Sequence, residues 1–200
     1  NKNSNVDSDF VQIGLSEGDQ YLGLYYLARN KKLPLEETFR LYGHLDMLWP
    51  VLKRLVQAYR NFKRVRGKID FTDMIEKFVE RDVPLDIDAL FVDEAQDLST
   101  LQWEMVRVLC ATPKDIVFVG DDDQAIMDFQ GADVKAFQNS SANKILLSQS
   151  HRVPKNIWSE AQRIVRRIQG RDIKLWHPTD IEGRVQHHGN LMDVPLTSGQ

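Results

Sequence analysis

The sequence contains a single cysteine, Cys110, and no long apolar run. One cysteine excludes an intramolecular disulfide and fits a reducing compartment. No stretch approaches the roughly 20 apolar residues of a membrane-spanning helix. The polar start, NKNSNVDSDF, also lacks the apolar core of a signal peptide. We therefore expect a soluble, cytoplasmic chain with no membrane partner.

The chain also carries little net charge. A formal charge of −3 at pH 7 gives no global basic field, so any nucleic-acid surface must be local. Its 200 residues, 42% of them hydrophobic, are ordinary for a globular protein of one large or two small domains. The sequence does not begin with methionine, so we expect a fragment or a processed product.

The most informative stretch is LFVDEAQD, which ends at Asp97. Its apolar start, Leu90 to Val92, runs directly into two adjacent carboxylates, Asp93 and Glu94. Such a run is typical of a strand buried on both faces of a parallel sheet, and ligands bind beyond the carboxyl ends of these strands. Carboxylates there can hold Mg²⁺ and orient a water. The alternative is an exposed acidic turn before a helix N-cap.

Two more apolar runs end in polar clusters. Ile116 to Val119 precedes the sequence GDDDQ, and Lys144 to Leu147 precedes SQSHR. Helix-compatible segments separate the runs, which is the order of parallel β-α-β units. We therefore predict an α/β fold with a parallel sheet. One edge of that sheet is expected to carry Asp93, Glu94, Asp121, Gln124 and Arg152.

Helical patterns fill most of the remaining sequence. Caps and prolines predict where they start or stop. The predicted helices include YLGLYYLAR, the segment 35–49 after Pro34, a helix from Val51, one capped by Asp70, one capped by Ser99 with Gln102, and one from Pro154 to a C-cap at Gly170.

The helix from Val51 carries a basic run interleaved with Tyr59 and Phe62. Such a face can contact a phosphate backbone while aromatic rings stack on bases. More often a charge run is the solvated face of a helix, and we favour that interpretation. The run consists of Lys53, Arg54, Arg60, Lys63, Arg64, Arg66 and Lys68.

Three stretches together resemble successive motifs of superfamily 1 DNA helicases of the UvrD/Rep type. They are LFVDEAQD, then VGDDDQAIMDFQGA, then LLSQSHRVPKNI. The segment DFTDM, residues 70–74, is similar to one that precedes these motifs in the family. The resemblance implies a partial RecA-like (P-loop NTPase) core with an N-terminal helical subdomain. It divides the chain into that subdomain (1–58), the later half of a first RecA-like domain (59–142) and the start of a second (143–200).

The resemblance also implies roles for individual residues. Asp93 is expected to hold the magnesium of Mg-ATP, and Glu94 to act as the base on the attacking water. Gln124 matches the glutamine that senses the γ-phosphate, and Arg152 the arginine that contacts this phosphate from the second domain. These parts are what phosphoryl transfer requires: a metal, a positioned water and a cation on developing charge.

The DNA-facing half of the second motif departs from the family pattern. Phe129 stands where the family stacks an aromatic ring on a single-stranded base, a contact that tolerates any sequence. Met127 replaces the usual tyrosine, however, and Gln130 the usual arginine. His151 replaces the tyrosine before Arg152. The resemblance therefore implies DNA binding with a weakened stacking loop.

A phosphate-binding loop of the Walker A type is absent from the sequence. Such a loop needs glycines followed by Lys and Ser or Thr, whereas Gly18 is followed by Asp-Gln and Gly14 lies in an unrelated context. The later motifs of a second RecA-like domain are absent as well. We therefore expect an internal piece of a helicase that does not by itself hydrolyse ATP efficiently.

Three functions compete. In the first, the chain belongs to an ATP-dependent helicase or translocase that moves on single-stranded DNA and unwinds duplex junctions. The second is an inactive helicase-like module that binds DNA or protein, which Met127 and Gln130 favour. The third, a metal-dependent nuclease using Asp121, Asp122 and Asp123, is the weakest, because nuclease sites need two converging metal-binding groups.

Overall fold

The computed structural model describes residues 16–140, 143–187 and 189. The chain divides into two compact units, residues 1–142 (unit 1) and 143–200 (unit 2). Gly14 lies outside the described residues. Within those residues, no helix combines the length and apolar character needed to cross a membrane.

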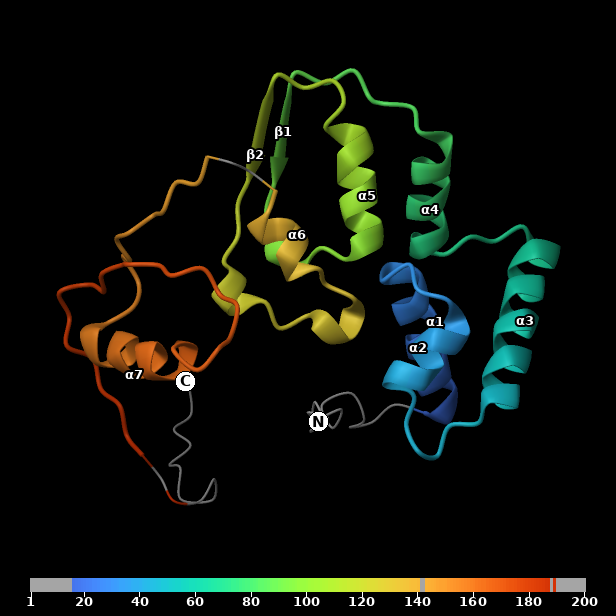
Figure 1. Cartoon of the computed structure of the whole chain (residues 1–200), viewed down its shortest axis with the longest axis horizontal. Coiled ribbons are helices and arrows are strands. Elements are labelled where there is room, and N and C mark those ends of the chain that lie inside the picture. The colour runs from blue at the N-terminus through green and yellow to red at the C-terminus, as the bar shows by residue number, and fades with distance from the viewer. Residues whose placement is uncertain (1–15, 141–142, 188, 190–200) are drawn as a thin grey trace. The chain divides into compact units, whose positions relative to one another are not determined.

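Unit 1 contains a two-stranded parallel sheet joined by a helix, as the sequence predicts. Strand β1 (Ala89–Val92) pairs with β2 (Asp115–Phe118), and Val92 lies opposite Phe118. Helix α5 (Thr100–Leu109) connects the two strands and lies along the sheet (Figure 1). The Trp103 ring of α5 packs 5.4 Å from the ring of Phe118. This β-α-β unit brings the carboxyl ends of both strands to the same edge.

The prediction that these strands are buried on both faces is wrong for the described residues. Alternate side chains of a strand point to opposite faces. Leu90 and Val92 are half-buried, whereas Phe91 between them is 72% exposed. Helix α5 therefore covers one face of the sheet, and within the described part of unit 1 the face that carries Phe91 is open.

The predicted third strand, Lys144 to Leu147, is not formed. These residues have no strand pairing, and Ile145 and Leu147 are 91% and 84% exposed. A strand exists only through hydrogen bonds to a neighbour, and the pairing found here is a single bridge between Gln149 and His177. The prediction that Arg152 follows a third strand of the β1–β2 sheet is therefore wrong.

The helices of unit 1 begin where capping residues predict. Asp70 caps α4 (Phe71–Arg81), and Ser99 caps α5 through a capping box with Gln102. Helix α1 (Glu17–Asn30) starts with a further capping box, and α2 (Leu35–Tyr42) follows Pro34. Helix α2 ends at Tyr42, with Gly43 as its C-cap, well short of the predicted residue 49. Helix α3 (Trp49–Arg66) has Pro50 in its first turn and runs across the predicted domain boundary at residue 58.

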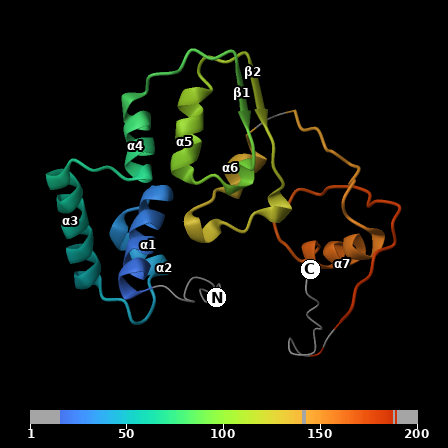
Figure 2. The ribbon, with the colours of Figure 1, turned by 180° about the vertical axis from the view of Figure 1, so that it is seen from behind.

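Helix α1 packs against α2 and α3 to form the main apolar core of unit 1. Helix α4 lies beside α5 in two opposite views (Figure 1, Figure 2). This core holds the helical part of the unit together. Helix α1 also contacts α4 and α5, so it links the helical part to the β-α-β unit. Its buried members are Tyr21, Leu24, Tyr25, Leu27, Met47, Leu52 and Val56.

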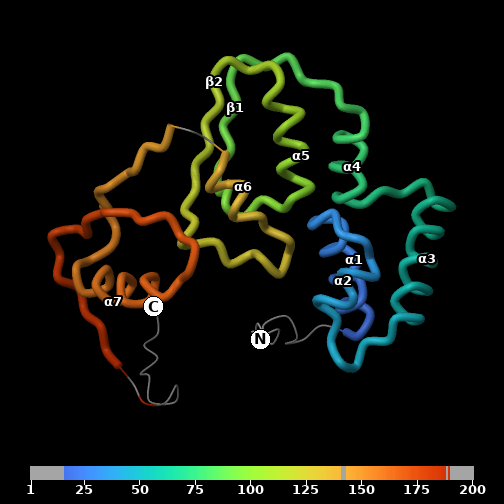
Figure 3. The backbone as a smooth tube through the Cα atoms, in the orientation of Figure 1, coloured from blue at the N-terminus to red at the C-terminus, as the bar shows by residue number. Residues whose placement is uncertain are grey.

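Short helices follow the strands. They are η2 (Ala95–Asp97), η3 (Asp122–Gln124), η4 (Asp128–Gln130) and α6 (Val134–Gln138). In unit 2, α7 (Lys155–Val165) starts after Pro154 as predicted, and the backbone trace around it is largely irregular (Figure 3). The helix ends at Val165 with Arg166 as its C-cap, so the prediction of Gly170 as the C-cap is wrong.

Candidate functional site

Asp93 and Glu94 leave the carboxyl end of β1 with exposed side chains. The Glu94 N–H donates a hydrogen bond to Asp93 Oδ1 over 2.9 Å. Glu94 has a φ of +48°, in the left-handed region that residues other than glycine rarely adopt. The chain therefore turns sharply here and presents two adjacent carboxylates to solvent at the edge of the sheet.

The segment after β2 reaches the same edge. Backbone pairing continues past the strands, because the Val119 N–H donates to Val92 O over 2.8 Å and the Ala95 N–H donates to Val119 O over 2.9 Å. Beyond them, Gln124 is exposed and its Nε2 donates to Asp121 Oδ2 over 2.7 Å. Of the predicted edge residues, the structure thus brings Asp93 and Glu94 to the edge that also carries the GDDDQ segment.

Gln96 joins these two segments, and its role was missed from the sequence. Its side chain is 1% exposed, and Nε2 donates to Glu94 Oε2 over 2.9 Å. The other end, Oε1, accepts the Asp121 N–H over 3.0 Å. The available signal was an uncharged amide inside the acidic run DEAQD, since an amide can donate and accept whereas ionised carboxylates only accept.

Gly120 makes room for this link. A Cβ atom added at Gly120 would lie 2.4 Å from Gln96 Oε1 and 3.0 Å from a ring carbon of Phe137. Real Cβ atoms do not approach other atoms that closely, so a side chain would displace the buried amide. The glycine before the three aspartates therefore follows from the close approach of Gln96.

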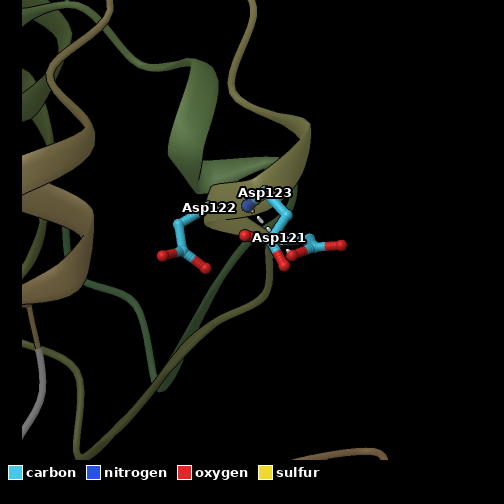
Figure 4. A group of neighbouring side chains, drawn as sticks. All are labelled: Asp121, Asp122 and Asp123. Atoms are coloured by element: carbon cyan, nitrogen blue, oxygen red, sulfur yellow. Dashed lines mark hydrogen bonds between the residues drawn. The ribbon is translucent and has the colours of Figure 1, made fainter. Parts of the chain in front are cut away.

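Asp121, Asp122 and Asp123 form the one group of clustered potential metal ligands among the described residues. One carboxylate oxygen from each lies within 4.8 Å of the others (Figure 4). The cluster also organises its own turn: Asp121 Oδ1 accepts the Asp123 N–H over 3.2 Å, and Asp122 Oδ2 accepts from Gln138 Nε2 over 2.8 Å. These hydrogen bonds explain the aspartates as turn residues, so the cluster alone does not support the nuclease hypothesis.

The predicted DNA-facing residues lie on the loop around η4. Phe129 is 50% exposed, Gln130 is exposed and Met127 is half-buried. The end of α1 holds this loop: Asn30 Nδ2 donates to Gln130 O over 2.9 Å, and Lys31 Nζ lies 2.8 Å from Asp128 Oδ1. The loop therefore presents an aromatic ring from a backbone anchored on the helical part of unit 1.

Arg152 lies in unit 2, in an exposed turn before α7. Its N–H donates to Ser150 Oγ over 3.2 Å, and the Val153 N–H donates to the same oxygen over 3.0 Å. These bonds shape the turn and leave the guanidinium exposed. Its role at a γ-phosphate stays a prediction.

A second cluster of charges, also missed from the sequence, joins α1, α3 and α4. The Arg29 side chain is 8% exposed and pairs with three carboxylates on or capping α4, at N–O distances of 3.1, 2.6 and 2.6 Å. Lys63 pairs with two of the same carboxylates at 2.6 Å. We call this group the buried ion cluster; it consists of Arg29, Lys63, Asp70, Asp73 and Glu76.

The buried ion cluster shifts the pKa of Asp70 and corrects the prediction that the basic face of α3 is solvated. Burial alone raises the pKa of Asp70. Hydrogen bonds from Lys63 and from the Asp73 N–H, with the charge of Arg29, outweigh burial and lower this pKa to about 2. The prediction of a solvated basic face is therefore wrong at Lys63, which is 8% exposed, and correct at Arg54, where the side chain is exposed.

Comparison with known proteins agrees with the motifs. Residues 11–144 match the UvrD/REP helicase N-terminal domain. The chain is 24% identical to DNA helicase II of Haemophilus influenzae over 72% of its own length, and 30% identical to DNA helicase II of Salmonella typhimurium over 68%. It is also 34% identical over 52% of its length to the ATP-dependent DNA helicase PcrA of Staphylococcus aureus.

The chain spans only part of these relatives: 25%, 21% and 15% of their respective lengths. The domain match nevertheless covers most of the sequence, including both segments that Gln96 joins. The resemblance drawn from the motifs is confirmed, and the chain belongs to the UvrD/REP helicase family.

Proposed function

We propose that this chain is part of an ATP-dependent DNA helicase or translocase. In that activity, Mg-ATP hydrolysis drives movement along single-stranded DNA and unwinding at duplex junctions. The observation that carries the proposal is the Gln96 bridge, which connects the Glu94 carboxylate to the backbone of the segment that contains Gln124. A motor needs its hydrolytic group and its phosphate sensor to be coupled, and the buried Gln96 amide would supply part of that link through the Asp121 N–H.

The side chains at the sheet edge suit Mg-ATP. Magnesium prefers hard oxygen ligands and keeps several waters, so it needs few protein carboxylates and an open position. Asp93 offers an exposed carboxylate directly after β1 and would hold the ion. When bound, Mg²⁺ neutralises charge on the phosphates. Glu94 would then accept a proton from the attacking water. The amide of Gln96 would orient the Glu94 carboxylate for this step.

DNA contact would reach this site along a short path. Gln124 and Phe129 are five residues apart on one continuous segment, which runs through η3 and η4. A base stacked on Phe129 would therefore move a loop whose other end carries the phosphate sensor. Arg152 would add a cation to the γ-phosphate from the second domain.

The same proposal assigns the parts of the chain. Residues 1–58 would form a helical subdomain, 59–142 the later half of a first RecA-like domain, and 143–200 the start of a second. ATP and Mg²⁺ would be the cofactors, single-stranded DNA and duplex junctions the partners, and the cytoplasm the location.

ATP hydrolysis by a longer form of the protein that includes a phosphate-binding loop tests the proposal. Single-stranded DNA is expected to stimulate hydrolysis, and Glu94→Gln to lower the stimulated rate by about 10²- to 10⁴-fold, the usual contribution of a general base. Glu80→Gln is the matched control, since Glu80 is exposed on α4, away from the sheet edge. Absence of turnover in the unaltered protein would instead establish the inactive binding module.

A further inference from the structure

A cavity of about 370 Å³ opens beside the buried ion cluster, between α1, α3 and the start of α4. Five of the side chains that line it are cationic and two are carboxylates. The cationic lining residues are Arg29, Arg60, Lys63, Lys68 and Lys77, and the carboxylates are Asp73 and Glu76. We call this cavity the α3–α4 pocket.

The two carboxylates are already engaged. Asp73 pairs with Arg29 and with Lys63, and Glu76 pairs with Arg29. The cations that pair with them are the two buried ones. Asp70 pairs with the same two cations, so the buried ion cluster holds two cations and three carboxylates and carries a net charge of −1. That charge offsets at most one of the three cations at the rim, and the pocket keeps a net positive charge.

The rim cations have no such partner. Arg60, Lys68 and Lys77 are exposed, and within the described part of the chain none forms an ion pair with a carboxylate. Arg60 is nevertheless held in place, because its Nε donates to the Tyr25 hydroxyl over 3.2 Å and its guanidinium lies 5.4 Å from the Tyr25 ring centroid. Its two terminal NH₂ groups remain available to bind an anion.

We propose that the α3–α4 pocket binds a phosphate of a single-stranded nucleic-acid backbone through Arg60, Lys68 and Lys77. A fixed guanidinium and two lysines match the donors that contact phosphates in nucleic-acid complexes. The inference deepens the proposed function, on which it rests, by adding a phosphate contact in the helical part of unit 1.

Two observations favour a nucleic acid over an acidic peptide. Apolar surface adjoins the cations: Ile69, which lines the pocket, is 52% exposed, and Phe71 two residues further is 85% exposed. Phe71 is the first residue of α4, directly after Asp70 of the buried ion cluster, and its exposed ring offers a stacking surface for a base. In addition, Arg29 in the pocket wall immediately precedes Asn30, which holds the loop of Phe129. One helix end thus supports both proposed contacts with a strand.

Binding of a fluorescently labelled oligo(dT) to this chain tests the proposal, with anisotropy measured between roughly 50 and 200 mM salt. Lys68→Gln with Lys77→Gln is expected to weaken binding about tenfold at the lowest salt. The same pair is expected to make the slope of log affinity against log salt less steep by about 1, because one or two phosphate contacts are lost. Arg54→Gln with Lys114→Gln removes the same charge from exposed positions outside the pocket and is expected to change the slope far less.

A slope that is the same in the pocket pair and the control pair overturns the inference. Phe129→Ala separates this failure from failure of the proposed function, because loss of stacking weakens binding at every salt concentration without changing the slope. If Phe129→Ala weakens binding and the pocket pair does not, the pocket proposal alone is wrong. If no oligo(dT) binding to this chain is detectable, the pocket proposal is wrong, and the proposed function is decided separately by DNA-stimulated hydrolysis in the longer protein.

Competition identifies the ligand. Inorganic phosphate that displaces oligo(dT) only at concentrations where chloride does the same supports a backbone phosphate bound as part of a strand. Saturable displacement by low concentrations of inorganic phosphate would show a site for free phosphate and overturn the nucleic-acid assignment. The nucleic-acid assignment would also be overturned if polyglutamate bound as tightly as oligo(dT) with the same dependence on Lys68 and Lys77. That result would show a site for an acidic peptide.

Discussion

Unit 1 contains two groups of charged side chains that differ in burial and in their partners. In the buried ion cluster each carboxylate has a cation within 3.1 Å, and Arg29 and Lys63 are at most 8–10% exposed at the side chain. At the sheet edge, Asp93 and Glu94 are exposed and are held mainly by neutral N–H donors. The first group satisfies its charges internally, and the second leaves them available to a ligand.

This difference shows that the burial and the partners of a carboxylate decide whether it stabilises the fold or is available to a ligand. The acidic run DEAQD and the segment DFTDM both contain several carboxylates. Asp93 and Glu94 of the first are exposed to solvent, whereas the carboxylates of the second pair with Arg29 and Lys63. A buried pair that loses one partner leaves an uncompensated charge, whereas an exposed carboxylate can be neutralised without that penalty. Changes to the first group should therefore alter stability, and changes to the second should alter activity.

The largest effect on stability is expected from Arg29→Ala. The change leaves Glu76 without its cation and Asp70 and Asp73 with Lys63 alone. Removing one partner of a buried ion pair costs about 3–5 kcal/mol. Urea unfolding followed by far-UV circular dichroism measures the loss. Glu94→Gln, the matching change at the sheet edge, is expected to alter the free energy of unfolding by less than about 0.5 kcal/mol.

Acid is expected to break the same cluster at a defined pH. The pKa of Asp70 falls from 3.8 to about 2 on folding, so the unfolded chain binds the proton more readily. The stabilisation from this group, about 2 kcal/mol, is complete above pH 4 or so and is lost as the pH falls toward about 2. Unfolding free energies measured across that range check the sign. Asp70→Asn should flatten this part of the pH profile; an unchanged profile would contradict the assignment.

Gln96→Leu tests the link inside the sheet-edge site. The substitution keeps the volume but removes the hydrogen bond from the Asp121 N–H to Gln96 Oε1, and loss of such a bond costs about 1 kcal/mol. Hydrolysis in the longer protein should fall as well, because Glu94 loses its amide donor. Gly120→Ala displaces the same amide from the other side and should produce a similar pattern. A stability loss with normal hydrolysis would make Gln96 purely structural.

The smallest effect is expected at an exposed pair in unit 2. Arg163 and Glu160 lie 2.9 Å apart on α7 with side chains 61% and 34% exposed. Solvent screens such pairs, so Arg163→Ala should change the free energy of unfolding by less than about 0.5 kcal/mol. Urea unfolding under the conditions used for Arg29→Ala gives a direct comparison of an exposed and a buried ion pair.

Local signals in the sequence predicted much of this structure. Asp70 and Ser99 fix helix starts through bonds to residues three positions away, so a short window contains the whole cause. The run from Leu90 to Val92 likewise became a strand. The run from Lys144 to Leu147 did not, because a strand depends on a partner that periodicity cannot supply.

Contacts between distant residues account for what the sequence did not reveal. Arg29 meets Asp70 across 41 positions, and Gln96 meets Asp121 across 25, so no spacing rule connects either pair. Lys63 looked like part of a solvated face because six other basic residues surround it in the sequence. Only the packing of α1 against α3, and the ion pairs of Lys63 with Asp70 and Asp73, show that it is buried.

Three consecutive residues at the C-terminal end of α1, the last of them its C-cap Lys31, have a consequence for local opening. Arg29 binds the α4 carboxylates, and Asn30 and Lys31 bind the loop of Phe129. Fraying of this helix end would break all of these bonds in one event, so α4 and the loop should share one opening reaction. Native-state hydrogen exchange should then show amides of α1, α4 and the Gln130 region opening with a common free energy, as a single cooperative folding unit.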